Sequence, residues 1–299
     1  MQDFFQKLNP QKLENALYVA ATPIGNLSDI TFRAVQILSD ADYVICEDSR
    51  VTSKLLSCYN ITEKKMIVYN DHCGLEVREK ILNLLIQGAS AVLVSDAGTP
   101  LISDPGHKLV QYLRQYGRKV IPLPGASAVT SALCASGLAC DNFLFLGFLP
   151  TTKIQRNNLL KSLPKNFTAV FFESANRVEA SLEAILETLG NRRVALAREL
   201  TKLHEDIISD EVKNVQEFFA NNPHKLRGEF VVIVEKIARD EKSLSEEELA
   251  DEIKKALKAG FSVKDLSQNL AEIYDLNKKD IYKIALEMSK TSFEKGGGA

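Results

Sequence analysis

Short apolar runs alternate with amphipathic stretches through the first half of the chain. The runs have the length of strands and lie at residues 17–21, 43–46, 66–69, 91–95 and 119–123. Between two of them, residues 76–87 carry apolar side chains at the spacing of one helical face. Strands that are apolar on both faces and are joined by helices are typical of parallel sheets. The pattern therefore predicts a parallel α/β domain over residues 15–125.

The second half keeps this alternation but changes the way in which the strands connect. Strand-like runs lie at residues 143–148, 168–173, 193–198, 206–209 and 230–235, and helices are expected near residues 153–163, 177–189 and 212–220. The link between 193–198 and 206–209 is short, which suits an antiparallel pair. We therefore predict a second α/β domain, with a mixed sheet, over residues 126–240.

The composition changes after Glu235. Residues 243–290 contain few β-branched residues, and their apolar side chains recur at helical spacing in three groups. The groups are Leu249, Ile253 and Leu257, then Leu266, Leu270 and Ile273, then Ile281, Ile284 and Met288. This pattern predicts a small three-helix domain over residues 241–290 that looks like a helix-turn-helix unit. The acidic run at residues 246–248 disfavours contact with DNA at that end.

Composition and charge restrict the class of protein. The chain has 299 residues, of which 45% are hydrophobic and 25% are charged, as is usual for globular proteins, and its net charge is -2. A nucleic acid would therefore have to bind a local basic patch. No apolar run reaches the ~20 residues of a membrane helix and the N-terminus lacks a secretion signal, so we expect a soluble, cytoplasmic protein. Five cysteines without a CxxC spacing favour reduced thiols, and no metal site is expected.

The stretch VSDAGTPLISDPG, at residues 94–106, follows the fourth predicted strand. Asp96 and Gly98 would lie at the carboxyl end of a parallel strand, where open α/β sheets bind ligands. Asp104 is expected to cap a helix that begins at Pro105. From these residues alone, a ligand site and an ordinary loop are equally good interpretations.

A second glycine loop, IPLPGASA at residues 121–128, follows the fifth predicted strand. Its amide groups and Ser127 could hold a polar ligand at a helix N-terminus, although on its own a tight turn that needs Gly125 is the simpler interpretation. Neither loop has the GxGxxG or GxxxxGK[ST] spacing, which disfavours NAD and ATP. Cations follow other predicted strands, at Arg177, Arg198, Lys202 and Arg227. These cations suit either phosphates or surface ion pairs.

Seven motifs occur in order along the chain. They are TPIGNLSDIT (22–31), EDSR.TSKLL (47–56), VSDAGTPLISDPG (94–106), PLPGASA (122–128), GFLP (147–150), FES..R (172–177) and ARELTK..E (197–205). In this order they resemble the ribosomal RNA small-subunit methyltransferase I family, a branch of the tetrapyrrole methylase superfamily, over roughly residues 15–240. TPIGN, DAGTP and ARELTK together distinguish this branch from relatives that act on corrins. One departure is His72-Cys73-Gly74, where the family pattern has His-Asn-Glu.

The resemblance implies two α/β domains of the tetrapyrrole methylase type, with S-adenosylmethionine in the cleft between them, usually in a homodimer. It implies methylation of the ribose 2′-hydroxyl of a cytidine in the decoding region of small-subunit ribosomal RNA. By motif, the cofactor-binding residues would be Pro23, Ser95, Asp96, Ala97, Gly98, Pro100, Ile102, Ser127, Ala128, Leu149 and Arg198. The cations expected to contact RNA phosphates are Arg33, Arg50, Arg156, Arg177 and Lys202.

The catalytic residues that the ARELTK motif implies are Glu199 and Lys202. Because the methyl donor is a sulfonium and is already activated, much of the catalysis can come from near-attack geometry. A base that takes the hydroxyl proton would add roughly 10²–10⁴-fold. Glu199, Asp96 and a neutral Lys202 all remain candidates for that base.

Three other functions remain open on the sequence alone. A tetrapyrrole (precorrin-type) methyltransferase would share the fold, a helix-turn-helix regulator would use its α/β part only to sense a ligand, and a ribosome-assembly factor would catalyse nothing. Under the favoured interpretation, no DNA partner is expected. The helical tail is expected to assist RNA or ribosome engagement and to take no part in the chemistry.

Overall fold

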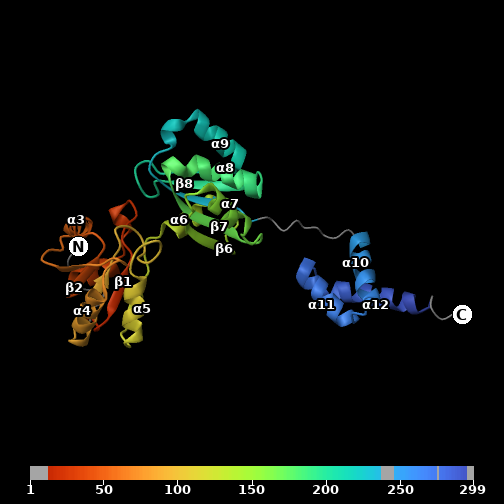
Figure 1. Ribbon diagram of the computed structural model, residues 1–299, viewed down its shortest axis with the longest axis horizontal. Helices are drawn as coiled ribbons and strands as arrows, with labels where there is room; N and C mark the ends of the chain where they lie inside the picture. Colours follow the sequence, from red (N-terminus) through yellow and green to blue (C-terminus); the bar gives the residue numbers. More distant parts are fainter. Residues whose placement is uncertain (1–12, 237–245, 275, 295–299) are drawn as a thin grey trace. The chain divides into compact units, whose positions relative to one another are not determined.

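The computed structural model describes residues 13–236, 246–274 and 276–294 (Figure 1). The chain divides into two compact units, Met1–Lys236 and Ile237–Ala299. The first unit holds two separate five-stranded sheets, and the second unit is helical.

The first sheet is parallel throughout, as predicted. β1 (Leu17–Ala20) lies between β4 (Ala91–Leu93) and β5 (Val120–Leu123), and beyond β4 come β2 (Tyr43–Cys46) and β3 (Lys65–Val68). Every neighbouring pair of these strands is parallel. The carboxyl ends of all five strands therefore share one edge, and the glycine loops follow that edge.

Helices cover both faces of this sheet. They are α2 (Phe32–Asp40), α3 (Ser49–Cys58), α4 (Leu75–Ile86) and α5 (His107–Gln115). Tyr18 of β1 is buried in a cluster with residues of α2 and α3, whereas its neighbour Leu17 is buried with residues of α4 and α5. Adjacent strand residues point to opposite faces, so burial on both sides explains the unbroken apolar runs.

The second sheet is mixed, as predicted. Its order is β6 (Phe143–Phe148), β7 (Thr168–Ser174), β10 (Glu229–Val234), β8 (Arg193–Arg198) and β9 (Asp206–Glu211). β6 and β7 are parallel, and the other neighbouring pairs are antiparallel, including the predicted β8–β9 pair. The register of β6 shifts between Phe145 and Phe148, around Gly147 with its φ of +65°.

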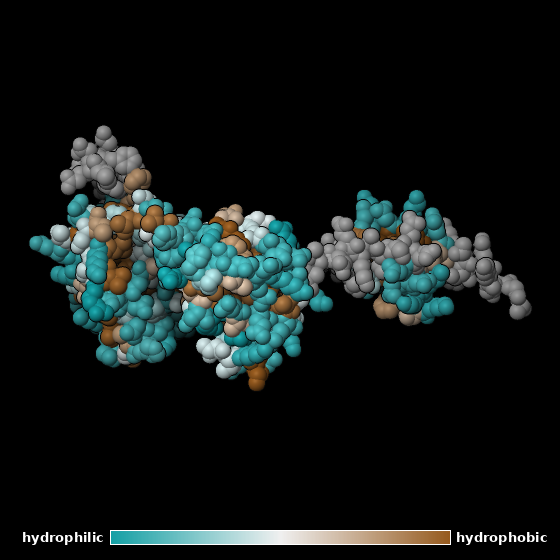
Figure 2. Space-filling model, turned by 90° about the horizontal axis from the view of Figure 1, so that it is seen from above, coloured by the Kyte–Doolittle hydropathy of each residue, from teal (hydrophilic) through white to brown (hydrophobic). Residues whose placement is uncertain are grey.

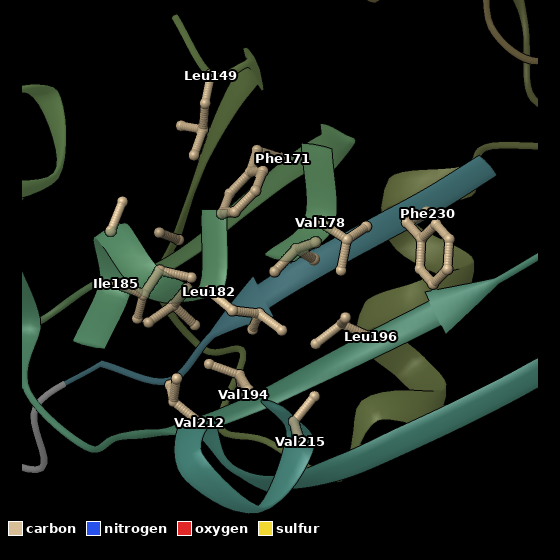
Figure 3. Close-up of a cluster of buried hydrophobic side chains, with 14 of the residues drawn as sticks. Leu149, Phe171, Val178, Leu182, Ile185, Val194, Leu196, Val212, Val215 and Phe230 are labelled. Atoms are coloured by element: carbon tan, nitrogen blue, oxygen red, sulfur yellow. The ribbon is translucent and has the colours of Figure 1, made fainter. Parts of the chain in front are cut away.

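The helices of this half are α6 (Ala128–Ser136), α7 (Lys153–Lys161), α8 (Val178–Leu189) and α9 (Val212–Asn221). It also contains two short 3-10 helices, η2 (Ala175–Arg177) and η3 (Pro223–Lys225), whereas a third, η1 (Leu27–Asp29), follows β1. Leu182 of α8 and Val215 of α9 point toward Leu196 and Phe230 of the sheet in the core of this face (Figure 3). α6 packs on the opposite face with Val231 and Ile233. Burying one such side chain contributes about 1.5–3 kcal/mol.

The structure corrects the predicted start of α5. The helix begins at His107 and its N-cap is Gly106, so Asp104 does not cap it. Gly106 has a φ of +130°, and a Cβ there would lie 3.0 Å from Cδ2 of Leu93. Leu101 and Ser103 also have positive φ values, of +74° and +65°. The chain therefore makes an irregular turn over residues 101–106 where a capped helix start was expected.

The second unit consists of α10 (Glu246–Lys258), α11 (Val263–Tyr274) and α12 (Lys278–Glu294). Its core contains the predicted positions in all three helices, among them Ile253, Leu266 and Ile281. The side chain of Ile273 lies outside the described residues. Hydrophilic residues cover much of the visible surface of each unit (Figure 2). No helix in the described part of the chain is long and apolar enough to cross a membrane.

Candidate active site

Three loops meet at the carboxyl edge of the first sheet. The loops after β1 and β4 are joined by a pair of backbone hydrogen bonds, from the Thr22 amide to the Gly98 carbonyl at 2.8 Å and from the Gly98 amide to the Thr22 carbonyl at 3.0 Å. The Thr22 hydroxyl donates to the Ser95 carbonyl at 3.2 Å. The Thr99 hydroxyl donates to the Ala126 carbonyl at 3.0 Å, which ties in the loop after β5. The glycine loops that the sequence singled out therefore form one connected rim.

Two glycines allow the backbone to follow this path. Gly98 has a φ of +79°, which side-chain-bearing residues rarely adopt. A Cβ on Gly125 would lie 2.8 Å from Cβ of Ala21, too close for any other residue. Ser127 is the N-cap of α6, but its side chain makes no capping hydrogen bond. The hydroxyl of Ser127 therefore does not cap the helix.

A cavity of about 390 Å³ opens beside this rim, within the range of small-molecule sites. Residues of both halves of the first unit line it: Ile24, Ala97, Ala128, Phe148, Phe172, Glu173, Ser174, Ala197, Leu200, Lys202, Gly228, Glu229, Phe230 and Val231. Most of the lining side chains are apolar. The rings of Phe148 and Phe172 meet edge to face, with centroids 5.6 Å apart.

One wall of the cavity depends on a buried carboxylate. Glu173 is 2% exposed, and its oxygens accept hydrogen bonds from the Ser181 hydroxyl at 2.7 Å and from the Ser174 amide at 2.9 Å. Its Oε1 also lies 3.2 Å from Nε of Arg177. Arg177 in turn donates to the carbonyl of Leu149, in the GFLP loop. Glu173 and Arg177 therefore hold this loop against the end of β7.

A charged turn after β8 forms the other wall. Nζ of Lys202 lies 2.9 Å from Oε1 of Glu199 and 2.8 Å from Oε2 of Glu229. Burial alone would lower the pKa of Lys202, but its hydrogen bonds to Glu229 and Glu199 outweigh burial and raise that pKa. Burial alone would raise the pKa of Glu199, but hydrogen bonds from Lys202 and from the Glu229 backbone lower it. Both groups are therefore charged at neutral pH, and the neutral Lys202 considered as a base is not supported.

The TPIGN loop closes against this charged turn. The Asn26 amide donates to the hydroxyl of Thr201 at 3.0 Å. A Cβ on Gly25 would lie 2.5 Å from Cγ of Lys202, 2.7 Å from the Thr201 hydroxyl and 2.8 Å from the Leu200 carbonyl. Only glycine fits this approach without displacement. Two motifs that are 175 residues apart in sequence thus meet beside the cavity.

Carboxyl groups gather at the outer part of the rim. Burial raises the pKa of Glu47, and the charges of Asp96, Asp104 and Asp48 raise it further. Burial also raises the pKa of Asp104, with Asp96 adding to the effect. The electrostatic potential at this part of the site is therefore negative, which favours a positively charged ligand group. Among the described residues, no group of three or more His, Cys, Asp or Glu residues could hold a metal ion.

The predicted cofactor residues fall into three groups. Ala97 and Ala128 line the cavity directly. Ser95, Gly98 and Pro100 are buried, Pro23 is half-buried beside Thr22, and Ser127 is half-buried at the start of α6, while Asp96 and Ile102 are exposed on the rim. Leu149 is buried in the core of the second sheet, and Arg198 lines a neighbouring pocket. Their contact with a cofactor stays a prediction.

The apolar wall of the cavity could not be predicted from the sequence. Phe148, Phe172 and Val231 lie on strands, and their apolar character alone could not separate a cavity wall from a core. Glu173 lies inside the FES motif, which was the available signal, but its burial and its partners depend on tertiary structure.

The cations predicted to contact phosphates have different surroundings. Arg156 is 7% exposed and donates to the Thr151 carbonyl, and Arg177 is turned toward Glu173. Arg33 is exposed on α2. Arg50 is exposed and pairs with Asp48 at 2.6 Å, and this hydrogen bond lowers the pKa of Asp48 to about 2. Arg33 and Arg50 are therefore accessible, whereas Arg156 and Arg177 support loops.

Sequence comparison shows an extended similarity. Residues 16–216 match a family model described as Tetrapyrrole (Corrin/Porphyrin) Methylases. A protein of Pasteurella multocida called Ribosomal RNA small subunit methyltransferase I is 41% identical over 280 residues, which cover 92% of this chain and 98% of the relative. A Synechocystis protein of the same name is 41% identical over 275 residues, covering 91% and 98% of the two chains.

Solved structures share the fold at low sequence identity. The methyltransferase CobJ superposes with a TM-score of 0.55 and 20% identity, over 75% of this chain and 95% of that chain. Uroporphyrin-III-C-methyltransferase from Thermus thermophilus superposes with a TM-score of 0.53 and 17% identity, again over 75% and 95%. These likenesses confirm the predicted pair of α/β sheets.

Proposed function

This chain belongs to the tetrapyrrole methylase family and is a methyltransferase that uses S-adenosylmethionine, and we propose that it methylates the ribose 2′-hydroxyl of a cytidine in the decoding region of small-subunit ribosomal RNA. The observation that carries the proposal is 41% identity, over 92% of this chain, to a relative named for small-subunit ribosomal RNA. The fold alone does not select the acceptor, because the same architecture also serves tetrapyrrole methylases.

The residues of the cavity fit S-adenosylmethionine. The volume of the cavity, about 390 Å³, and its apolar walls suit an adenosine, with Ile24, Ala97 and Ala128 on the side of the glycine loops. The carboxyl groups of Asp96 and Glu47 on the rim suit the positive charges of the ligand. When bound, this cofactor supplies a methyl group on a sulfonium. We propose that the glycine loops hold it through the residues predicted from the sequence.

The charged turn is proposed to position the acceptor. Lys202 lines the cavity and is a cation, so it can attract a phosphate or hold a ribose oxygen but cannot accept a proton. Glu199 is ionised but engaged by Lys202 and by the Glu229 amide, which makes it a weak base. Orientation of the hydroxyl against the methyl group is therefore the main contribution expected from this wall.

A cytoplasmic homodimer is the proposed working form, as the resemblance to the ribosomal RNA methyltransferases implies. The helical second unit is proposed to assist engagement of the RNA or of the assembled subunit.

Methyl transfer to RNA tests the proposal. Labelled methyl groups from S-adenosylmethionine should reach small subunits or their RNA, and replacement of the target cytidine by its 2′-deoxy form should abolish the labelling. Label on a base, or label that survives the 2′-deoxy substitution, would contradict attack by the ribose oxygen. Transfer to a tetrapyrrole precursor with none to RNA would replace the proposed acceptor.

A further inference from the structure

A second pocket of about 500 Å³ lies next to the cavity. Its lining residues come from the turn after β8 and from the segment before β10: Arg198, Glu199, Leu203, His204, Glu205, Asp206, His224, Lys225, Arg227 and Gly228. Gly228 also lines the cavity, so the two spaces share a wall. A Cβ on Gly228 would lie 2.4 Å from Cδ of Glu199, so the shared wall is thin and fully packed.

The acidic side chains of this pocket are already engaged. Glu199 pairs with Lys202 at 2.9 Å, and Asp206 pairs with Lys225 at 2.7 Å. Glu205 accepts a hydrogen bond from the Thr201 amide at 2.6 Å. These carboxylates are therefore satisfied inside the protein and do not need a ligand.

Several basic side chains of the pocket are not engaged in this way. Within the described residues, the side chains of Arg227, His204 and His224 form no hydrogen bond and no ion pair. Nη1 of Arg198 donates to the Lys225 carbonyl at 3.2 Å, but its buried Nε has no hydrogen-bond partner in the described chain. A guanidinium carries five donors in a fixed fork that matches phosphate oxygens. The unused donors of the pocket therefore suit an anion.

The rim of the pocket also presents an apolar group to solvent. Leu203 is 92% exposed, at the tip of a turn in which Glu199 and Thr201 both have positive φ values, of +48° and +64°. Non-glycine residues in this conformation are strained, and such strain persists where the surrounding structure fixes it, often at binding sites. An exposed leucine beside two imidazoles can contact an unstacked nucleobase, since single-stranded RNA is recognised by stacking and by contacts to splayed bases.

We propose that this pocket binds a backbone phosphate of single-stranded RNA, next to the nucleotide whose ribose enters the cavity, with Arg227 as its principal contact. This inference rests on the proposed function, because it assigns the adjoining pocket to the same substrate. The shared wall at Gly228 sets the phosphate beside the methyl acceptor, so the contact would fix the register of the strand.

The full chain with Arg227→Gln tests this contact against a fragment of small-subunit ribosomal RNA. The variant should bind the RNA roughly tenfold more weakly. The slope of log K against log salt concentration should fall by about 0.7, the change expected when one phosphate contact to a single strand is lost. Arg227→Lys should recover part of the affinity, and calorimetry should give an unchanged affinity for S-adenosylmethionine. Arg114→Gln, an exposed arginine near the end of α5, is the matched control and should behave as the wild type.

Inorganic phosphate provides a second probe that does not depend on methylation. The chain has only four histidines, and His204 and His224 both line the pocket, so their imidazole NMR signals report on it. Phosphate should shift these two signals, identified with His204→Gln and His224→Gln, and should leave those of His72 and His107 in place. The shifts should disappear in Arg227→Gln.

The outcomes separate the two proposals. A wild type that shows the phosphate shifts but methylates no RNA would refute the proposed acceptor and leave an anion pocket. Wild-type RNA affinity and salt slope in Arg227→Gln would refute the phosphate contact, even if methylation is normal. Loss of S-adenosylmethionine binding in Arg227→Gln would assign the pocket to the cofactor and would equally overturn the inference.

Discussion

Substitution of Gly25 by alanine should disturb the contact between the TPIGN loop and the charged turn. The added Cβ would lie 2.5 Å from Cγ of Lys202, 2.7 Å from the Thr201 hydroxyl and 2.8 Å from the Leu200 carbonyl. All three distances are below 3.0 Å, and the last involves backbone, so rotation of one side chain cannot relieve the overlap. Overpacking of this kind costs about 1–3 kcal/mol.

Because the contact lies beside the cavity, its loss should be measurable as weaker cofactor binding. If the two loops separate, the cavity wall moves, and a strain of about 1–3 kcal/mol corresponds to roughly 5–150-fold weaker binding of S-adenosylmethionine. Separation should also break the hydrogen bond from the Asn26 amide to Thr201. We therefore expect Gly25→Ala to weaken cofactor binding in calorimetry and to speed hydrogen exchange at Asn26.

Gly117→Ala is the matched control. Gly117 has a φ of +69°, and a Cβ there would meet no atom within 4 Å, so this variant carries backbone strain without a steric overlap. It should lower the free energy of unfolding by about 1–2 kcal/mol and leave cofactor affinity and exchange at Asn26 unchanged. If Gly25→Ala binds the cofactor as well as Gly117→Ala does, the contact at Gly25 does not shape the site.

Substitutions of Glu173 and Asp104 test two carboxyl groups of the site, with Glu187 as a control. Glu173→Gln should lower the free energy of unfolding by about 1–3 kcal/mol, because Arg177 would lose its carboxylate partner. By loosening the Leu149 loop, this variant should also weaken cofactor binding. Glu187→Gln removes one partner of an exposed pair and should leave the free energy of unfolding nearly unchanged, so equal effects of the two substitutions would contradict the assignment. Burial raises the pKa of Asp104 in the folded state, so the contribution of this carboxyl group to stability is present below its unfolded-state pKa and is lost as the pH rises through its folded-state pKa. Asp104→Asn should therefore become more stable relative to the wild type as the pH rises from pH 4 to pH 7, as measured by urea unfolding followed by circular dichroism. A difference in stability that stays constant over this range would refute the shift.

β1 and β2 could be predicted from the sequence because they are buried on both faces. The runs at residues 17–21 and 43–46 match β1 and β2 to within one residue. β9 extends to Glu211, two residues beyond the predicted end, because it is an edge strand whose last residues are polar and exposed. The predicted start of α5 was wrong because the path of residues 101–106 depends on tertiary packing around Gly106, which no local capping pattern encodes.

For a similar reason, the loops of the candidate site could be predicted from the sequence, whereas the partners of its charged side chains could not. Glycine loops at strand ends carry a local signal, and Ala97 and Ala128 do line the cavity. Charged side chains carry no local signal of their partners. Arg177 and Lys202 each pair with a carboxylate, Glu173 in one case and Glu199 in the other, and no local pattern indicates these pairs. Their contact with phosphates stays a prediction. Glu173 lies four residues before Arg177, yet its role depends on being buried beneath the wall.

The relative size of two catalytic effects indicates which residues matter most for methyl transfer. A general base contributes roughly 10²–10⁴-fold, which corresponds to about 3–5 kcal/mol, whereas orientation of the reacting groups can contribute about 7–11 kcal/mol. Lys202 is held as a cation and Glu199 is engaged by two donors, so this turn is poorly suited to accept a proton and well suited to fix a geometry. The residues that hold the walls in place, Gly25 on one side and Glu173 on the other, therefore contribute to the larger of the two effects, the orientation of the reacting groups.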